Sequence, residues 1–159
     1  MKVDFEKKFS KRILILFLGC LVISAMYIVH SLYSFYSFDS LLQEESPAKI
    51  VHCSLDICSS EDEFTVPIDV ESDLFDCLIR LLRSEQYTKP LASILGHTVS
   101  AYRIESYPFY RILFQHEDYH RTEVVVNGSF LLIGSTTGPG LTVYQASDDS
   151  LLGGLNALF

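Results

Sequence analysis

Hydrophobic and polar positions divide the chain into one long apolar block and a longer stretch in which short apolar segments alternate with polar ones. The block Ile13–Phe38 contains no Asp, Glu, Lys or Arg. An α-helix needs about 20 apolar residues to cross the hydrocarbon core of a bilayer, so this run predicts one transmembrane helix. Its last part, residues 31–38, alternates serine with tyrosine, phenylalanine and leucine. Such a composition is typical of the aromatic belt at a membrane–water interface.

Two other interpretations of the apolar block compete with an anchor. A cleaved signal peptide has an apolar region of about 7–15 residues followed by small residues at the cleavage site. This run is longer and ends in bulky aromatic residues. Phe17-Leu18-Gly19-Cys20 faintly matches a bacterial lipoprotein box, but the apolar stretch continues beyond Cys20 instead of giving way to a polar tether. We therefore expect an uncleaved anchor.

Beyond the block, the pattern predicts a linker, strands and one main helix. Asp39–Lys49 is polar and contains Pro47, which favours a spacer. Ser72 and Asp73 are N-cap candidates for a helix with apolar residues at helical spacing, acidic residues at its start and Arg83 at its end. The predicted strands are Ile50–Leu55, Phe64–Val70, Val99–Ile104, Phe109–Gln115, Thr122–Val126, Ser129–Ile133 and Leu141–Gln145.

Turn residues connect these strands into an antiparallel meander. Asn127-Gly128 lies between two apolar runs and predicts a two-residue hairpin. His116 to His120 is expected to turn the preceding hairpin. Residues 147–149 are cap candidates for a short final helix, which Gly153-Gly154 weakens. A meander with one main packed helix predicts an α+β domain.

Charge orients this layout. Residues 1–12 carry a net charge of +3, whereas the rest of the chain has 7 basic and 18 acidic residues, a net charge of −11. The positive-inside rule places the N-terminus in the cytoplasm and residues beyond 38 on the other side of the membrane. We expect a basic tail at 1–12, an anchor at 13–38, a linker at 39–49 and an extracytoplasmic domain at 50–159. The acidic balance argues against nucleic acid as a partner, because phosphate binding needs a basic surface.

Three cysteines lie outside the predicted span. An extracytoplasmic location allows one disulfide among Cys53, Cys58 and Cys77, with one thiol left over. In one straight strand, the odd spacing of Cys53 and Cys58 places them on opposite faces, so a bridge between them requires a bend. Cys77 falls on the predicted helix and is an alternative partner for either. Zinc is the rival interpretation, but one Cys-x4-Cys without a second pair is weak for a structural site. We favour a disulfide and leave its pairing open.

No catalytic motif is visible. The chain has no Gly-rich phosphate loop, no HExxH and no Gly-x-Ser-x-Gly, so we expect neither an enzyme nor a cofactor. The segment from His116 to His120 has a composition that metals favour, but a solvated turn is the simpler interpretation. A metal-binding or acid-sensing role of these two histidines stays open.

Aromatic residues follow the meander. They either fill the core or line a cavity for an apolar ligand, as in small barrels. The candidate ligand-binding residues are Tyr102, Phe109, Tyr110, Phe114, Phe130 and Tyr144. A third possibility is strand pairing with another chain, for which Thr122–Val126 is the candidate.

The arrangement of Lys7–Arg12, Ile13–Phe38, the helix from Ser72 and the meander around Asn127-Gly128 resembles a known family. These are the ToxS-like companions of membrane-bound transcription regulators, including the VtrC and PsaF type. The resemblance covers the whole chain as a layout and assigns no site residues. It implies a bacterial inner-membrane protein with a periplasmic C-terminal domain. A tail too short to fold agrees with a companion that does not itself bind DNA.

The resemblance also implies a partner. In the family, the companion's periplasmic domain assembles with that of a second single-pass membrane protein, a sensor that regulates virulence. In some members the pair encloses a barrel that binds bile salts. We therefore expect a non-enzymatic accessory protein that forms a heterodimer, with a possible shared pocket for a small apolar ligand. The alternative is a stand-alone extracytoplasmic binding or envelope-maintenance domain.

Overall fold

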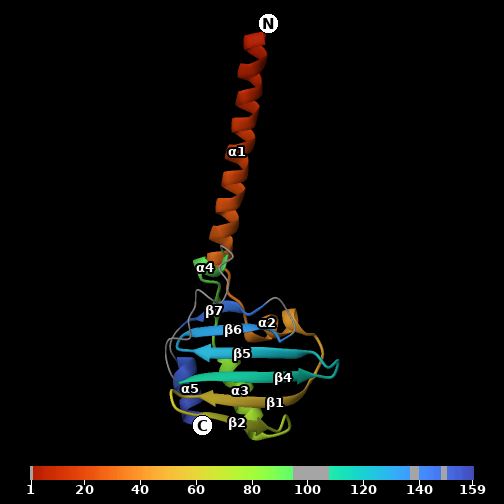
Figure 1. Cartoon of the computed structure of the whole chain (residues 1–159), viewed down its shortest axis with the longest axis vertical. Helices are drawn as coiled ribbons and strands as arrows, with labels where there is room; N and C mark the ends of the chain where they lie inside the picture. Colours follow the sequence, from red (N-terminus) through yellow and green to blue (C-terminus); the bar gives the residue numbers. More distant parts are fainter. Residues whose placement is uncertain (1, 95–107, 137–139, 148–149) are drawn as a thin grey trace.

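One long helix projects from a small folded domain (Figure 1). The computed structural model describes residues 2–94, 108–136, 140–147 and 150–159. The projecting helix is α1 (Lys2–Tyr33), and its segment Ile13–Tyr33 has 21 residues with a mean hydropathy of 2.5. Residues 13–27 are all exposed. The segment is therefore long and apolar enough to cross a membrane.

The domain is built on a seven-stranded antiparallel sheet. From the edge farthest from α1 to the edge nearest it, the order is β2-β1-β4-β5-β6-β7-β3 (Figure 1). The strands are β1 (Ile50–Cys58), β2 (Glu63–Ile68), β3 (Tyr87–Thr88), β4 (Phe109–His116), β5 (Arg121–Asn127), β6 (Phe130–Ser135) and β7 (Thr142–Ala146).

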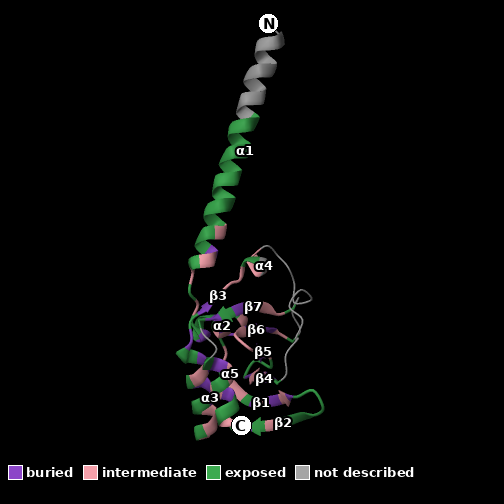
Figure 2. Cartoon of the chain, turned by 90° about the vertical axis from the view of Figure 1, so that its left-hand side faces the viewer, coloured by how far each residue is buried: buried purple, intermediate pink, exposed green. Residues whose placement is uncertain are grey.

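Helices cover one face of this sheet (Figure 2). They are α2 (Phe38–Glu45), α3 (Asp73–Ser84) and α5 (Ser150–Leu158), while the short α4 (Leu91–Ile94) contacts α1. The main core lies between helices and sheet, because alternate strand residues point to this face. Its fully buried members include Phe38, Leu41, Leu55, Leu78, Leu82, Ile112, Phe114, Val124, Leu131, Leu151 and Leu155. A smaller cluster on the opposite face contains Cys58, Phe109, Val125, Leu132 and Val143.

The structure confirms the predicted α+β class and most predicted elements. Six of the seven predicted strands are present, with ends shifted by up to three residues, and Val99–Ile104 lies outside the described residues. The main helix begins where the sequence indicated, because the Ser72 hydroxyl accepts a hydrogen bond from the Phe75 amide at 3.2 Å. The final helix is α5, whereas β3 and α4 were not predicted.

The β5–β6 hairpin differs by one residue from the prediction. Asn127 pairs with Phe130, so the two loop residues are Gly128 and Ser129. Gly128 has φ +58, which fits a type II′ turn with glycine at its first central position. The turn between β4 and β5 lies where it was predicted, and Tyr119 there has φ +64.

The predicted linker at 39–49 is wrong, since this segment is folded into the domain. The helix α1 ends at Tyr33, and Phe38 already begins α2 with a side chain that is 0% exposed. The Ser37 hydroxyl caps α2 by accepting a hydrogen bond from the Ser40 amide, and Leu41 is buried beneath the helix. The polar residues suggested a spacer, but they occupy only the outer face of a two-turn amphipathic helix.

Backbone hydrogen bonds fix both ends of α2. On its N-terminal side, Tyr36 and Tyr87 exchange two backbone bonds of 2.8 and 3.0 Å, so Tyr36 extends the sheet beside β3. On its C-terminal side, the Glu117 amide donates to the Lys49 carbonyl at 2.9 Å. Only Ser34 and Phe35 separate the end of α1 from Tyr36. The junction between the apolar helix and the domain therefore contains no flexible spacer.

Candidate functional site

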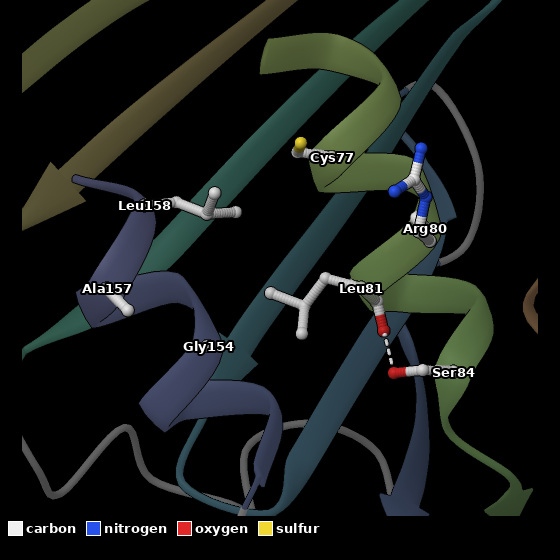
Figure 3. Close-up of a pocket in the computed structure, with 7 residues that line it drawn as sticks. All are labelled: Cys77, Arg80, Leu81, Ser84, Gly154, Ala157 and Leu158. Atoms are coloured by element: carbon white, nitrogen blue, oxygen red, sulfur yellow. Dashed lines mark hydrogen bonds between the residues drawn. The ribbon is translucent and has the colours of Figure 1, made fainter. Parts of the chain in front are cut away.

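An apolar groove lies between α3 and α5 on the outside of the helical layer (Figure 3). It has a volume of about 350 Å³, within the range of small ligand pockets. Its lining residues are Cys77, Arg80, Leu81, Ser84, Gly154, Ala157 and Leu158. In Figure 3 the side chains of Leu81 and Leu158 point into the space between the helices, whereas the Arg80 guanidinium points away from α5.

The groove follows from how the two helices pack. In α3, Leu78, Ile79 and Leu82 are buried against the sheet. The residues on the other sides of the helix therefore face outward or toward α5. In α5, Leu151 and Leu155 are buried, which turns Gly154 and Leu158 toward α3. A Cβ at Gly154 would overlap both Cδ atoms of Leu81, so the helices approach closely at this point.

A buried carboxylate holds the start of α5. Glu85 is 6% exposed and follows α3 directly. It accepts hydrogen bonds from the hydroxyl of Ser147 at 2.9 Å and from that of Ser150, the first residue of α5. A negative charge at a helix N-terminus is also favoured by the helix dipole. These contacts fix the position of α5 against α3 and keep the groove formed.

The groove has a mainly apolar lining with one charged residue. Arg80 is the only charged residue of the lining, and no described residue forms a salt bridge with it. By contrast Arg83, on the same helix, is paired with Asp39 of α2 at 2.8 Å. An apolar floor with a free cation at its rim can bury an apolar group and pair with an acidic one.

The cysteines form no disulfide. All four are free thiols, and the bridge that the sequence favoured is absent. The physical reason is the geometry of β1, where Cys53 faces the helices and Cys58 faces the opposite side of the sheet. Cys77 is exposed in the groove, whereas Cys53 and Cys58 are both buried. Burial raises the pKa of Cys53 to about 12 and also raises the pKa of Cys58, so both remain thiols at neutral pH.

The aromatic ligand candidates do not gather around one cavity. Tyr110, Phe114 and Tyr144 lie in the main core, while Phe109 and Phe130 lie on the opposite face of the sheet. None of these five lines the α3–α5 groove, and Tyr102 lies outside the described residues. Burial raises the pKa of Tyr110 and Tyr144, and the Tyr110 hydroxyl donates to the Asn156 side chain at 2.6 Å. Their placement is that of core residues.

Of the two histidines, His116 connects the segment that follows α2 to β5. His116 is 1% exposed, with Nδ1 2.8 Å from the Ala48 carbonyl oxygen and Nε2 2.9 Å from the Thr122 hydroxyl. A carbonyl can only accept, so Nδ1 carries a proton and donates it. The His120 ring lies 6.2 Å from that of His116. Within the described ranges, no three His, Cys, Asp or Glu side chains are placed to hold a metal ion.

Among the strands that the structure describes, neither edge is well suited to pairing with another chain. The candidate pairing segment Thr122–Val126 lies in β5, which is hydrogen-bonded to β4 and β6 on its two sides, so that prediction is wrong. The free edge is β2, where Glu63 and Pro67 are both exposed. Charged residues and proline on an edge strand oppose strand addition. The opposite edge, β3, already pairs with Tyr36.

The groove was not predicted from the sequence. One available signal was the pair Gly153-Gly154, which we expected only to weaken the final helix. A glycine on the buried side of a short helix often marks close packing against a neighbour.

No protein-family model, curated protein or solved structure matches the chain.

Proposed function

We propose that this is a single-pass membrane protein whose extracytoplasmic domain docks beside a second membrane-anchored protein and stabilises it. The N-terminus lies in the cytoplasm, as the basic tail favours. In a bacterium the membrane is the inner membrane and the domain is periplasmic. The partner is a sensor or transcription regulator of the kind that the layout resembles.

The junction between α1 and the sheet carries this proposal. A simple tether would need only a flexible linker, but here Tyr36 is hydrogen-bonded to Tyr87 and Phe38 is fully buried a few residues after α1 ends. The domain is therefore held close to the end of α1, with little freedom to rotate relative to that helix. A fixed orientation favours recognition of another protein in the same membrane, because less rotational freedom is lost on binding.

The α3–α5 groove is the docking surface that fits this role. Glu63 and Pro67 oppose strand addition at the β2 edge, and the Tyr36–Tyr87 bridge occupies part of the β3 edge, so we expect a contact made by apolar packing instead of strand pairing. We expect the partner to place an apolar side chain against Leu81 and Ala157 and a carboxylate near Arg80. An apolar ligand shared by the two domains would have to lie at this same interface.

The experiment is site-specific photo-crosslinking of the full-length chain in its native membrane. A photoreactive residue at Ala157, which is exposed in the groove, should form an adduct with a second membrane protein. The same residue at Gln43, which is exposed on α2 outside the groove, should not. The substitution Ala157→Glu should abolish co-purification of that protein, whereas Gln43→Glu should leave it unchanged.

A flexible insertion tests the junction itself. Several Gly-Ser repeats between Ser34 and Phe35 should weaken the adduct while leaving the domain folded. Two results would contradict the proposal: recovery of the mature chain as a free soluble protein, as a cleaved signal sequence would give, or a full-length chain that crosslinks to nothing in its native membrane. The second result would favour a stand-alone binding domain.

A further inference from the structure

The end of α1 is not surrounded by solvent alone, because α4 packs against it (Figure 1). Residues 13–27 of α1 are exposed, but Ile28 and Leu32 are half-buried and Ser31 is only 8% exposed. The domain therefore covers one side of the last turns of the candidate span.

The height of this contact can be placed from helix geometry. An α-helix rises 1.5 Å per residue, so about 20 residues from Ile13 cross a hydrocarbon core of about 30 Å and end near Leu32. The covered residues of α1 lie at this boundary. A segment packed beside them reaches the same depth, which is the interface between acyl chains and headgroups.

Three large side chains that are exposed at this level are apolar or aromatic. Tyr33 is 76% exposed, Phe35 is 65% exposed and Leu91, the first residue of α4, is 48% exposed. They continue the apolar surface of the span onto the domain. Tyrosine, phenylalanine and leucine side chains exposed at this depth partition favourably into the bilayer interface.

Charge in this region also fits a membrane surface. The chain is acidic overall, yet residues 28–38 and 87–94 contain no Asp or Glu, and their only Lys or Arg is Lys89. The Lys89 ammonium lies 5.2 Å from the ring centre of Tyr36 and 5.4 Å from that of Tyr144. The Lys89 ammonium can attract anionic lipid headgroups, while Glu44 and Glu45, the carboxylates that act electrostatically on the neighbouring Tyr144, belong to α2.

We propose that Tyr33, Phe35 and α4 form a second membrane contact, which seats the β3–β7 edge of the domain on the bilayer. The contact rests on the proposed insertion of α1 into the membrane. It makes the bilayer itself a binding partner of the domain, and it fixes the angle between the sheet and the membrane in addition to its height.

The absence of tryptophan from the chain makes a direct test possible. Single tryptophans are introduced into the full-length protein, reconstituted in vesicles of phosphatidylcholine and phosphatidylglycerol that carry spin-labelled lipids. Leu91→Trp and Phe35→Trp are the test positions. Ile23→Trp, in the middle of the span, and Phe64→Trp, exposed on β2 at the far edge of the sheet, are matched controls.

We expect Leu91→Trp and Phe35→Trp to show blue-shifted emission and to be quenched most by labels near the headgroup. Ile23→Trp should be quenched most by labels deep in the acyl chains, and Phe64→Trp only by a water-soluble quencher. If both test positions behave like Phe64→Trp while Ile23→Trp is quenched in the acyl region, the second contact is overturned and the anchor stands. If Ile23→Trp is itself quenched only from water, the anchoring on which the contact rests is overturned.

Discussion

Cys53 lies between β1 and the helical layer, where burial leaves its thiolate without solvation. Its pKa is raised to about 12 from an ordinary value of 9.0. The folded protein therefore keeps a proton on this sulfur above pH 9.0, whereas the unfolded chain releases it. Because the unfolded state then binds fewer protons, the free energy of unfolding must fall as pH rises between these two pKa values.

We predict that the protein loses stability in alkali over this window. Burial also raises the pKa of Tyr87 and Tyr144, so their contribution adds to that of Cys53 above about pH 10. The measurement is the urea midpoint at a series of pH values from neutral upward. A Cys53→Ala variant should be less stable at neutral pH because of the lost packing, but its midpoint should fall less steeply above pH 9.0.

Thiol labelling provides the control for this prediction. A brief treatment of the folded protein with iodoacetamide should label the exposed Cys77 and leave Cys53 unlabelled until urea is added, as read by peptide mass spectrometry. Labelling of Cys53 in the folded state at the rate of Cys77 would contradict its burial. The same experiment reports a Cys53–Cys58 bridge, because neither bridged cysteine would be labelled without a reductant.

At the scale of elements, hydrophobic periodicity correctly predicted the helices and strands whose signals lie within their own sequence. The helix from Ser72 has a cap, an apolar stripe and charges that agree with its dipole, so every local signal points to the same structure. The strands β4, β5 and β6 are long enough for alternation to define them. Their turn at Gly128 was displaced by one residue, because a type II′ and a type I′ loop make different use of the same Asn-Gly pair.

The missed elements are those that depend on distant contacts. The helix α2 has few apolar residues, and only its burial of Phe38 and Leu41 against the sheet makes it a part of the core. The strand β3 has two residues and exists because β7 and Tyr36 lie on either side of it. The groove likewise needs two helices that are some 70 residues apart in the chain. No local pattern encodes such pairings, so they could not be predicted from the sequence.

The two glycines of α5 give a matched test of the groove. A Cβ at Gly153 meets nothing within 4 Å, whereas a Cβ at Gly154 overlaps the side chain of Leu81. We predict that Gly153→Ala raises the free energy of unfolding by up to about 1 kcal/mol, because alanine favours the helix. Gly154→Ala should fail to give this gain, since Leu81 or α5 must move. Equal stabilisation of both variants in urea unfolding would contradict the close approach of the two helices.

At the scale of the whole molecule, the helix and the domain cannot be separated at the position that the polarity pattern suggests. A fragment that begins at residue 40 removes Tyr36, which pairs with β3, and Phe38, which is fully buried in the core. A fragment that begins at residue 34 keeps both and discards only α1. The two fragments differ by six residues, but we expect them to differ greatly in stability.

We predict that fragment 34–159 has a Tm at least about 10 °C above that of fragment 40–159, because loss of a buried phenylalanine alone costs about 3–5 kcal/mol. Within fragment 34–159, Phe38→Ala should reproduce most of the loss, whereas Phe35→Ala, at a position that is 65% exposed, should have little effect. Calorimetry measures all four proteins. Equal Tm values for the two fragments would show that α2 is not part of the core.

The comparison also separates two causes of instability, because a weak fragment 40–159 is expected even for a domain that needs no partner. Among these stability measurements, the one that would support the proposed heterodimer is therefore stabilisation of fragment 34–159 or of the full-length chain by a second protein.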